Sequence, residues 1–170
     1  MMATPPDPNA PIREYRYTVD RDGRIFHDGS EIIDPVVLRF FLLAMQHTED
    51  GRYLVICQNE RNWFEAPDTP FVVQRVQCRI EHDHLAAVEL HFVGDYHETL
   101  DPGTLETDGP YLYCRVRRRL FRARLGRNAV QQLAPFLAEE GGEAALLLGG
   151  HRWEVRQAER PLLDRSTTGT

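Results

Sequence analysis

The sequence predicts an α+β fold made of two tandem ββαββ units joined by a long β-hairpin. Short runs of alternating apolar and polar residues, separated by turn signals, predict several strands. Helix start signals occur at two places, Asp34-Pro35 and Asn128. Because the order hairpin, helix, hairpin occurs twice, we interpret the chain as an internal duplication.

Five segments follow from this interpretation. The N-terminal segment is rich in proline and has no apolar run, so we expect a disordered tail and no secretory leader. The expected segments are a tail at 1–12, a first unit at 13–66, a bridging hairpin with an acidic connection at 67–110, a second unit at 111–158 and a C-terminal tail at 159–170.

The first unit begins with a hairpin over 13–33, in which Asp22-Gly23 supplies a tight turn. Asp34 is a suitable N-cap and Pro35 a suitable first residue for the helix that follows. The run RYLVICQ predicts a buried strand, paired with ERNWFEA across a short polar turn.

Two prolines, Pro67 and Pro70, end this pattern because neither can continue a strand ladder. The runs FVVQRVQCRI and LAAVELHFV then predict two long strands, which form the bridging hairpin over 71–93. A polar and acidic connection leads from it to the second unit.

The second unit repeats the pattern, with a hairpin over 111–125, a helix capped by Asn128 and a hairpin that turns at Gly149-Gly150. We expect it to match the first unit at particular aromatic positions. These pairs are Tyr15 with Tyr111, Tyr17 with Tyr113, Phe26 with Phe121, and Trp63 with Trp153.

Composition excludes several function classes. All 20 basic residues are arginine, so a P-loop lysine, a Schiff-base lysine and a lysine general base are excluded. The two serines, Ser30 and Ser166, lie outside any G-x-S-x-G motif, which argues against serine hydrolase chemistry. Three cysteines in strand-like runs are typical of buried free thiols in a reducing cytoplasm. No apolar run is long enough to predict a membrane span.

One stretch, residues 111–127, holds seven arginines and no acid in a chain of net charge −6. Alternation along its predicted hairpin places tyrosines and arginines on one face, where they could bind phosphates, carboxylates or stacked bases. The predicted anion- or partner-binding residues are Tyr111, Tyr113, Arg115, Arg117, Arg122 and Arg124.

Three interpretations of this arginine face remain open. Its arginines could pair with the acidic connection at 95–108, within one chain or across a dimer. They could clamp a small anionic metabolite, with Arg115, Arg122 and Arg124 as ligands and His91 acting on it. Nucleic-acid binding is a third interpretation, which the acidic overall pI near 5.6 disfavours.

Histidines at a predicted hairpin tip form a weaker candidate site. His82 and His84 flank Asp83, but a metal site needs three or four converging ligands. We therefore favour an exposed polar turn over a metal site.

Several motifs occur in order over about residues 13–157, namely DGRIFHDG, DGRYLVICQNERNWFEAPDTPF, HFVGD, PYLYCRV, F-x-A-x-L-x-R and GGHRWEV. Taken together, they resemble the bacterial DUF1285 family. The opening REYRYTVDRDGRIFHD and the segment CQNERNWF also resemble UPF0598 (DUF4505). The resemblance implies a two-part, roll-like α+β fold and carries over no catalytic residue. The acidic connection at 95–109 departs from the DUF1285 pattern.

The sequence as a whole favours a non-catalytic cytoplasmic binding or assembly module, with the arginine hairpin as its recognition face. We expect a protein partner or self-association, no cofactor, no metal and no membrane contact. The alternative is a small enzyme or sensor for an anionic metabolite.

Overall fold

A computed structural model describes residues 7–159 of the 170-residue chain. The predicted tails therefore lie largely outside the described residues, at positions 1–6 and 160–170. The described part is mostly β-sheet with two α-helices, which confirms the α+β class. No helix in it is long and apolar enough to cross a membrane.

The first unit is built on a six-stranded sheet. Its spatial order is β3-β2-β1-β6-β5-β4, and every pairing is antiparallel except that of β1 with β6. The strands are β1 (Arg13–Val19), β2 (Ile25–His27), β3 (Ser30–Glu31), β4 (Gln46–His47), β5 (Tyr53–Cys57) and β6 (Glu60–Glu65).

Helix α1 (Pro35–Ala44) begins as its capping signals predict. The Asp34 carboxylate accepts a hydrogen bond from the Val36 amide at 2.9 Å, and Pro35 is the first helical residue. Its inner side packs into the core through buried leucine and phenylalanine side chains, and Phe41 meets Tyr17 and Phe64 of the sheet.

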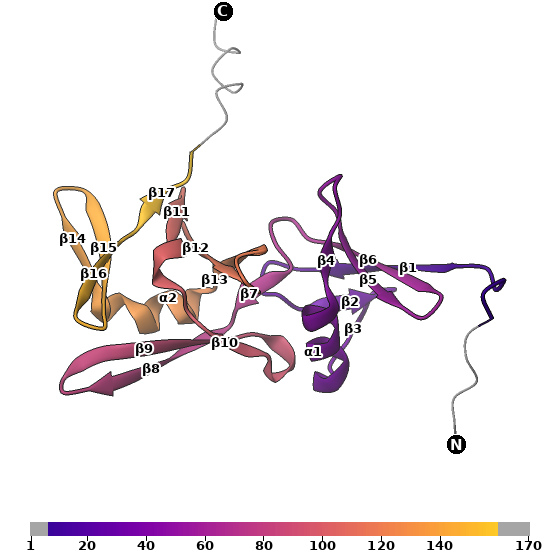
Figure 1. Ribbon diagram of the computed structural model, residues 1–170, viewed down its shortest axis with the longest axis horizontal. Helices are drawn as coiled ribbons and strands as arrows, with labels where there is room; N and C mark the ends of the chain where they lie inside the picture. Colours follow the sequence, from indigo (N-terminus) through magenta and orange to yellow (C-terminus); the bar gives the residue numbers. More distant parts are fainter. Residues whose placement is uncertain (1–6, 160–170) are drawn as a thin grey trace, which may run out of the picture.

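The bridging segment is divided differently from the prediction. The first strand of this segment is β7 (Phe71–Val73), which pairs in parallel with β13 (Phe121–Leu125) of the second unit. The hairpin proper is β8 (Arg75–Glu81) with β9 (His84–His91), extended by β10 (His97–Thr99). In Figure 1 the hairpin runs beneath the second unit, where the Gln132 side chain of helix α2 (Arg127–Leu133) accepts a hydrogen bond from the Val76 amide at 2.8 Å.

The remaining elements lie in the rest of the bridging segment, up to residue 110, and in the second unit. Strand order is β17-β11-β12-β13-β7 in one sheet and β14-β15-β16 in another. The elements are η1 (Val93–Asp95), η2 (Pro102–Thr104), β11 (Glu106–Asp108), β12 (Tyr111–Val116), β13 (Phe121–Leu125), α2 (Arg127–Leu133), η3 (Ala134–Phe136), β14 (Leu137–Glu140), β15 (Glu143–Leu148), β16 (His151–Glu154) and β17 (Arg156–Gln157).

Helix α2 does not start where the sequence predicts. Its cap residue is Gly126, which has no capping side chain, and Asn128 is already inside the first turn. The Gly126 amide donates to the Val73 carbonyl at 2.9 Å, and a Cβ at this glycine would lie 2.8 Å from the same oxygen. Close contact between chain segments therefore sets the start of this helix, rather than a side-chain cap.

Both units have an opening hairpin, a helix and a closing three-stranded meander, β4-β5-β6 in one and β14-β15-β16 in the other, and the first unit has the additional short strand β3 before its helix. The predicted ββαββ pattern omits β3, β4 and β14. The opening hairpins close at Val19–Ile25 and at Val116–Phe121. Ile25 and Phe121 are the first paired residues after these two turns, so they occupy corresponding positions. The sequence analysis instead matched Phe26 with Phe121.

The closing hairpins show the same one-residue shift. Glu60 and His151 are the first residues after the two turns, so Asn62 corresponds to Trp153. A shift of one residue moves a side chain to the other face of a sheet. Trp63 and Trp153 therefore do not occupy equivalent positions, and the tryptophan pair does not support a duplication.

One hydrophobic cluster runs through all three segments. It includes Val19 and Leu42 of the first unit, Leu90 of the bridge, and Leu125 and Leu133 of the second unit, each 2% exposed or less. Segments of about fifty residues bury a small share of their surface and are only marginally stable alone, so a shared core stabilises both.

Candidate binding site on the arginine hairpin

The β12–β13 hairpin brings five of the six predicted binding residues onto one face. Tyr113 lies opposite Arg124, and Arg115 lies opposite Arg122. Directly opposed residues in an antiparallel pair share a face, and Tyr111 joins them two residues before Tyr113. The period-two alternation in the sequence was enough to predict this set.

Arg117 does not belong to this face, so its assignment was wrong. It lies in the hairpin turn with φ +50°, and its Nη1 donates to the carbonyls of Leu42 at 2.9 Å and Met45 at 2.8 Å. These carbonyls end α1, where they have no partner inside the helix. Arg117 therefore caps the C-terminus of α1 and binds the second unit to the first.

The turn that carries Arg117 has an unusual backbone. Arg117, Arg118 and Arg119 all have φ between +50° and +66°, a region that costs an ordinary side chain about 1–2 kcal/mol. Two acids hold the turn in place. Glu98 accepts the Arg117 amide at 3.1 Å, and Asp101 receives both Nε and Nη2 of Arg119 at 2.8 Å.

Arg122 is packed between an aromatic ring and two acids. Its Cζ lies 3.6 Å from the centre of the Tyr113 ring, and its nitrogens approach Glu106 and Asp108 at 3.1 Å. The Nε–H does not point at the Glu106 oxygen, so that contact is an ion pair without a hydrogen bond. Burial alone would lower the pKa of the guanidinium, but the Asp108 hydrogen bond and the Glu106 charge outweigh it and raise the pKa.

Arg124 is the least exposed arginine of the face, with 12% of its side chain accessible. Its Nε lies 3.4 Å from Asp68, and its Nη2 donates to the backbone carbonyl of Arg21 in the first hairpin. Its Cζ lies 5.4 Å from the centre of the Tyr111 ring. Like Arg117, it connects the second unit to the first.

Tyr113 is buried and also binds Asp68. Its hydroxyl donates to Asp68 Oδ2 at 2.8 Å. Burial and the bond to this carboxylate raise the pKa of the phenol to about 12. Asp68 thus fixes the positions of both Tyr113 and Arg124.

Internal pairing with the acidic connection, one of the three interpretations, matches the contacts of Arg119 and Arg122. Arg115 and Arg118 form no such ion pair, since within residues 7–159 no carboxylate lies within 4.0 Å of either guanidinium. Both residues are exposed. These two arginines therefore remain available to an external anion.

A cavity of about 220 Å³ opens beside Tyr113. Three chain segments line it, namely the turn of the first hairpin, the linker after β6, and the β12–β13 hairpin. The lining residues are Arg21, Pro67, Asp68, Tyr111, Tyr113 and Arg124. Asp68 offsets the charge of Arg124, whereas Arg21, which is exposed and also lines the cavity, has no ion pair among the described residues.

A second cavity of about 260 Å³ lies on the other side of Tyr111 and Arg124. Its other lining residues are Pro110, Leu112, Leu125, Arg127, Val130 and Gln131. The two cavities share Tyr111 and Arg124, which places a charged recess next to a more apolar one.

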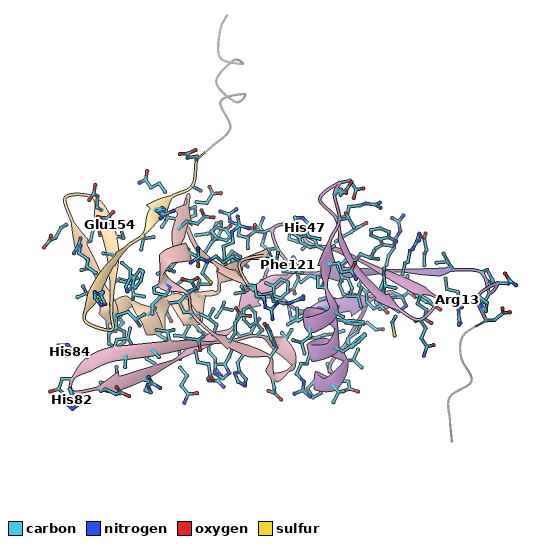
Figure 2. All side chains as sticks on the ribbon, in the orientation of Figure 1. Arg13, His47, His82, His84, Phe121 and Glu154 are labelled. Carbon is cyan, nitrogen blue, oxygen red and sulfur yellow. The ribbon has the colours of Figure 1, made fainter. Side chains whose placement is uncertain are left out.

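The other predicted chemical groups lie elsewhere. His82 and His84 are exposed at the tip of β8–β9 (Figure 2), and no metal-binding cluster occurs among the described residues. His91 contacts Glu89 at 2.7 Å and Arg75 at 3.2 Å on its own sheet. Burial raises the pKa of the Cys114 thiol to about 12, so this cysteine is a poor nucleophile near neutral pH.

Two residues of the cavity were missed at the level of sequence. Arg21 lies in the first turn, and Asp68 lies between two prolines in a segment interpreted only as a strand break. An acid flanked by prolines is a weak signal in the absence of an alignment. Their role depends on contacts with residues about 45 and 103 positions away in the chain.

Comparisons with known proteins define the fold. No protein-family model and no curated protein matches this chain. A DUF1285 family protein from Silicibacter pomeroyi DSS-3 superposes with a TM-score of 0.65 at 20% identity, over 91% of this chain and 90% of that one. A DUF1285 family protein from Shewanella baltica OS155 superposes with a TM-score of 0.57 at 13% identity, over 70% and 90%. The resemblance that the sequence motifs predict therefore holds at the level of structure: this chain has the fold of DUF1285 family proteins.

Proposed function

We propose that this protein is a non-catalytic binding module whose recognition site is the cavity between the two units. Its ligand is a small molecule that carries a carboxylate or a phosphate. The observation that supports this most is the position of Arg21, an unpaired cation that lines a cavity whose other charged groups neutralise each other. The exposed Tyr111 ring supplies a flat surface beside it.

A non-catalytic role is supported by the state of the ionisable groups at this cavity. A phenol with a pKa of about 12 is a poor general acid or base near neutral pH. Asp68 already accepts a hydrogen bond from the Tyr113 hydroxyl and forms an ion pair with Arg124. These groups position a ligand well but have little capacity to move its protons.

Binding of an anion in the cavity is expected to stabilise the folded chain. Arg21 belongs to the first unit and Tyr111 to the second, so a bound anion contacts both units and stabilises their present arrangement. By mass action, a ligand that binds the folded chain raises its melting temperature.

A thermal-shift screen followed by calorimetric titration tests the proposal. The panel contains small mono- and dicarboxylates and phosphate monoesters. We expect at least one compound to stabilise the wild-type chain and to bind the Arg21→Ala variant about 10- to 100-fold more weakly, as expected for loss of a charged hydrogen bond.

Arg16→Ala is the matched control. Arg16 lies on β1, has 83% of its side chain exposed, and its guanidinium forms one ion pair among the described residues, with Glu65 at 3.6 Å. Binding that is equally weakened in both variants, or that survives in Arg21→Ala, contradicts the assignment of the cavity. Chemical conversion of a bound compound, detected by mass spectrometry, contradicts the non-catalytic role.

We also propose that the two units arose by duplication and that the protein acts in the cytoplasm. The common order of elements supports the duplication. The presence of three unpaired thiols supports a reducing compartment. A duplication predicts a specific pattern in an alignment of related sequences. The first and second units should resemble each other when they are superimposed so that their hairpin turns coincide.

A further inference from the structure

The second cavity, of about 260 Å³, lies between the open end of the β12–β13 hairpin and helix α2, which are neighbours in Figure 1. The helix contributes Arg127, Val130 and Gln131. Val130 and Gln131 follow Arg127 by three and four residues, so all three lie on one face of α2. This helix face and the end of the hairpin therefore form the two sides of the cavity.

Apolar side chains of the cavity lining belong to the core or pack against it. Leu112 and Leu125 are members of the hydrophobic core, and Val130 packs against that core. All three also line the cavity. An apolar group placed in the cavity therefore extends the core outward and leaves contact with water, which is favourable for binding.

The charged residues that line this cavity, among those described, are both arginines. Arg124 already lies 3.4 Å from Asp68, with which it forms an ion pair. Arg127 is exposed, and within residues 7–159 no carboxylate lies within 4.0 Å of its guanidinium. The cavity therefore offers one arginine without an ion pair beside an apolar wall.

This combination suits a ligand with a carboxylate at one end and an apolar group at the other. A guanidinium can donate two parallel hydrogen bonds to a carboxylate. The side-chain amide of Gln131, which is exposed, can donate another. Ligand pockets commonly have volumes of roughly 300–1,000 Å³ and combine apolar walls with a few polar groups that orient the ligand. A cavity of about 260 Å³ therefore restricts the ligand to a small molecule.

We propose that this cavity is a second binding site, which takes a carboxylate that carries a short alkyl or phenyl group. Arg127 binds the carboxylate, and Leu112, Leu125 and Val130 contact the apolar group. The site shares Tyr111 and Arg124 with the Arg21 cavity but has its own cation and its own leucine and valine side chains. Binding here does not require a ligand at Arg21.

An NMR titration of the full-length, ¹⁵N-labelled chain with acetate, butanoate and hexanoate tests the proposal. We expect the amide signals of residues 110–112 and 124–131 to shift. The affinity should rise about fourfold for each added methylene until the cavity is filled, because each methylene leaves water.

Arg127→Ala should bind hexanoate about 10-fold more weakly than the wild type, because it removes the charged donors for the carboxylate. The variant should remain folded, since Arg127 is exposed at the first position of α2 and alanine favours a helix. Arg39→Ala is the matched control. Arg39 is also an exposed helical arginine without a carboxylate within 4.0 Å among the described residues, so its loss removes the same charge elsewhere. Arg39→Ala and Arg21→Ala should both bind hexanoate like the wild type.

Three results would overturn the proposal: no shift with any of the carboxylates, an affinity that does not rise from acetate to hexanoate, or hexanoate binding that Arg127→Ala leaves unchanged. A fourth result separates the two cavities. If the shifts lie at residues 20–22 and 67–68 and disappear in Arg21→Ala, the carboxylate binds in the first cavity. That outcome supports the function proposed for Arg21 and overturns the second site.

Discussion

The two hairpins that open the two units use arginine in opposite ways. In β1–β2 the charges pair locally, as Arg24 binds Asp20 at 2.8 Å within one turn. In β12–β13 there is no acid, and Arg117 and Arg124 reach the first unit, at α1 and at the Arg21 carbonyl. A hairpin of this shape is therefore stable with mixed charge. The additional arginines of the second hairpin connect parts of the chain that are distant in sequence.

The turns of the two hairpins differ as well. Gly23 provides the positive φ of the first turn, whereas three arginines adopt positive φ in the second. The second turn accepts this backbone strain because Glu98 and Asp101 bind it from outside. Strain held by tertiary contacts is a common feature of segments with a specific task.

The largest expected effect is that of Arg117→Met. This change leaves the carbonyls of Leu42 and Met45 without their charged donor, and we expect a loss of about 2–4 kcal/mol in the free energy of unfolding. Urea denaturation at neutral pH measures it. Arg24→Met, the corresponding change in the first hairpin, should have no measurable effect because its ion pairs are exposed. Equal effects of the two substitutions would contradict the distinction between the hairpins.

A smaller effect is expected for Gly23→Ala. Gly23 has φ +83°, and an added Cβ would lie 2.9 Å from Cβ of Val72. We expect a loss of about 2 kcal/mol by urea denaturation from backbone strain and the clash together. Gly29→Ala is the control, since Gly29 has φ +80° but no neighbour within 4 Å, and it should lose only about 1 kcal/mol. If Gly29→Ala lost as much stability as Gly23→Ala, the contact with Val72 would not explain the effect at Gly23.

The hydrogen bond between Tyr113 and Asp68 predicts that the stability difference between the wild type and Tyr113→Phe depends on pH in the alkaline range. The folded-state pKa of Tyr113 is about 12, above the ordinary value of 10.0. Its contribution is therefore fully present below pH 10 and is lost as the pH rises from 10 toward 12. Tyr113→Phe should be less stable than wild type at pH 7, and the difference in melting temperature should shrink above pH 10. Parallel melting curves across this range would show that Tyr113 does not titrate as described.

The smallest expected effect is a gain in stability. Arg118 has φ +56° and no polar contact among the described residues. Arg118→Gly relieves an unfavourable backbone conformation but adds freedom to the unfolded chain, so we expect a net gain of about 0.5 kcal/mol. Differential scanning calorimetry detects a change of this size as a shift in melting temperature. A clear loss would mean that the Arg118 side chain has a structural role.

Local signals in the sequence predicted much of the fold. The Asp22-Gly23 and Gly149-Gly150 turns, the Asp34-Pro35 helix start and the alternation along β12 all depend on neighbouring residues, and the structure has each of them. The start of α2 could not be found in this way, since Gly126 is placed by the Val73 carbonyl, more than fifty residues away.

The candidate site was predicted only in part for the same reason. Alternation correctly placed Tyr113 and Arg124 together, but it could not show that Asp68 binds both. It also could not show that Arg117 turns away to cap α1, because that depends on a left-handed backbone at an ordinary residue. The predicted correspondence between the two units is one residue out of register with the hairpin turns, because it pairs identical side chains rather than turns.

Arginines of the second hairpin hold the first unit in place. Hydrogen exchange monitored by mass spectrometry on the Arg117→Met variant tests this role most directly. We predict faster exchange in peptides that cover residues 40–47 of the first unit, while β15 and β16 keep the protection they have in the wild type. Faster exchange confined to residues 111–125, with residues 40–47 unchanged, would contradict the claim.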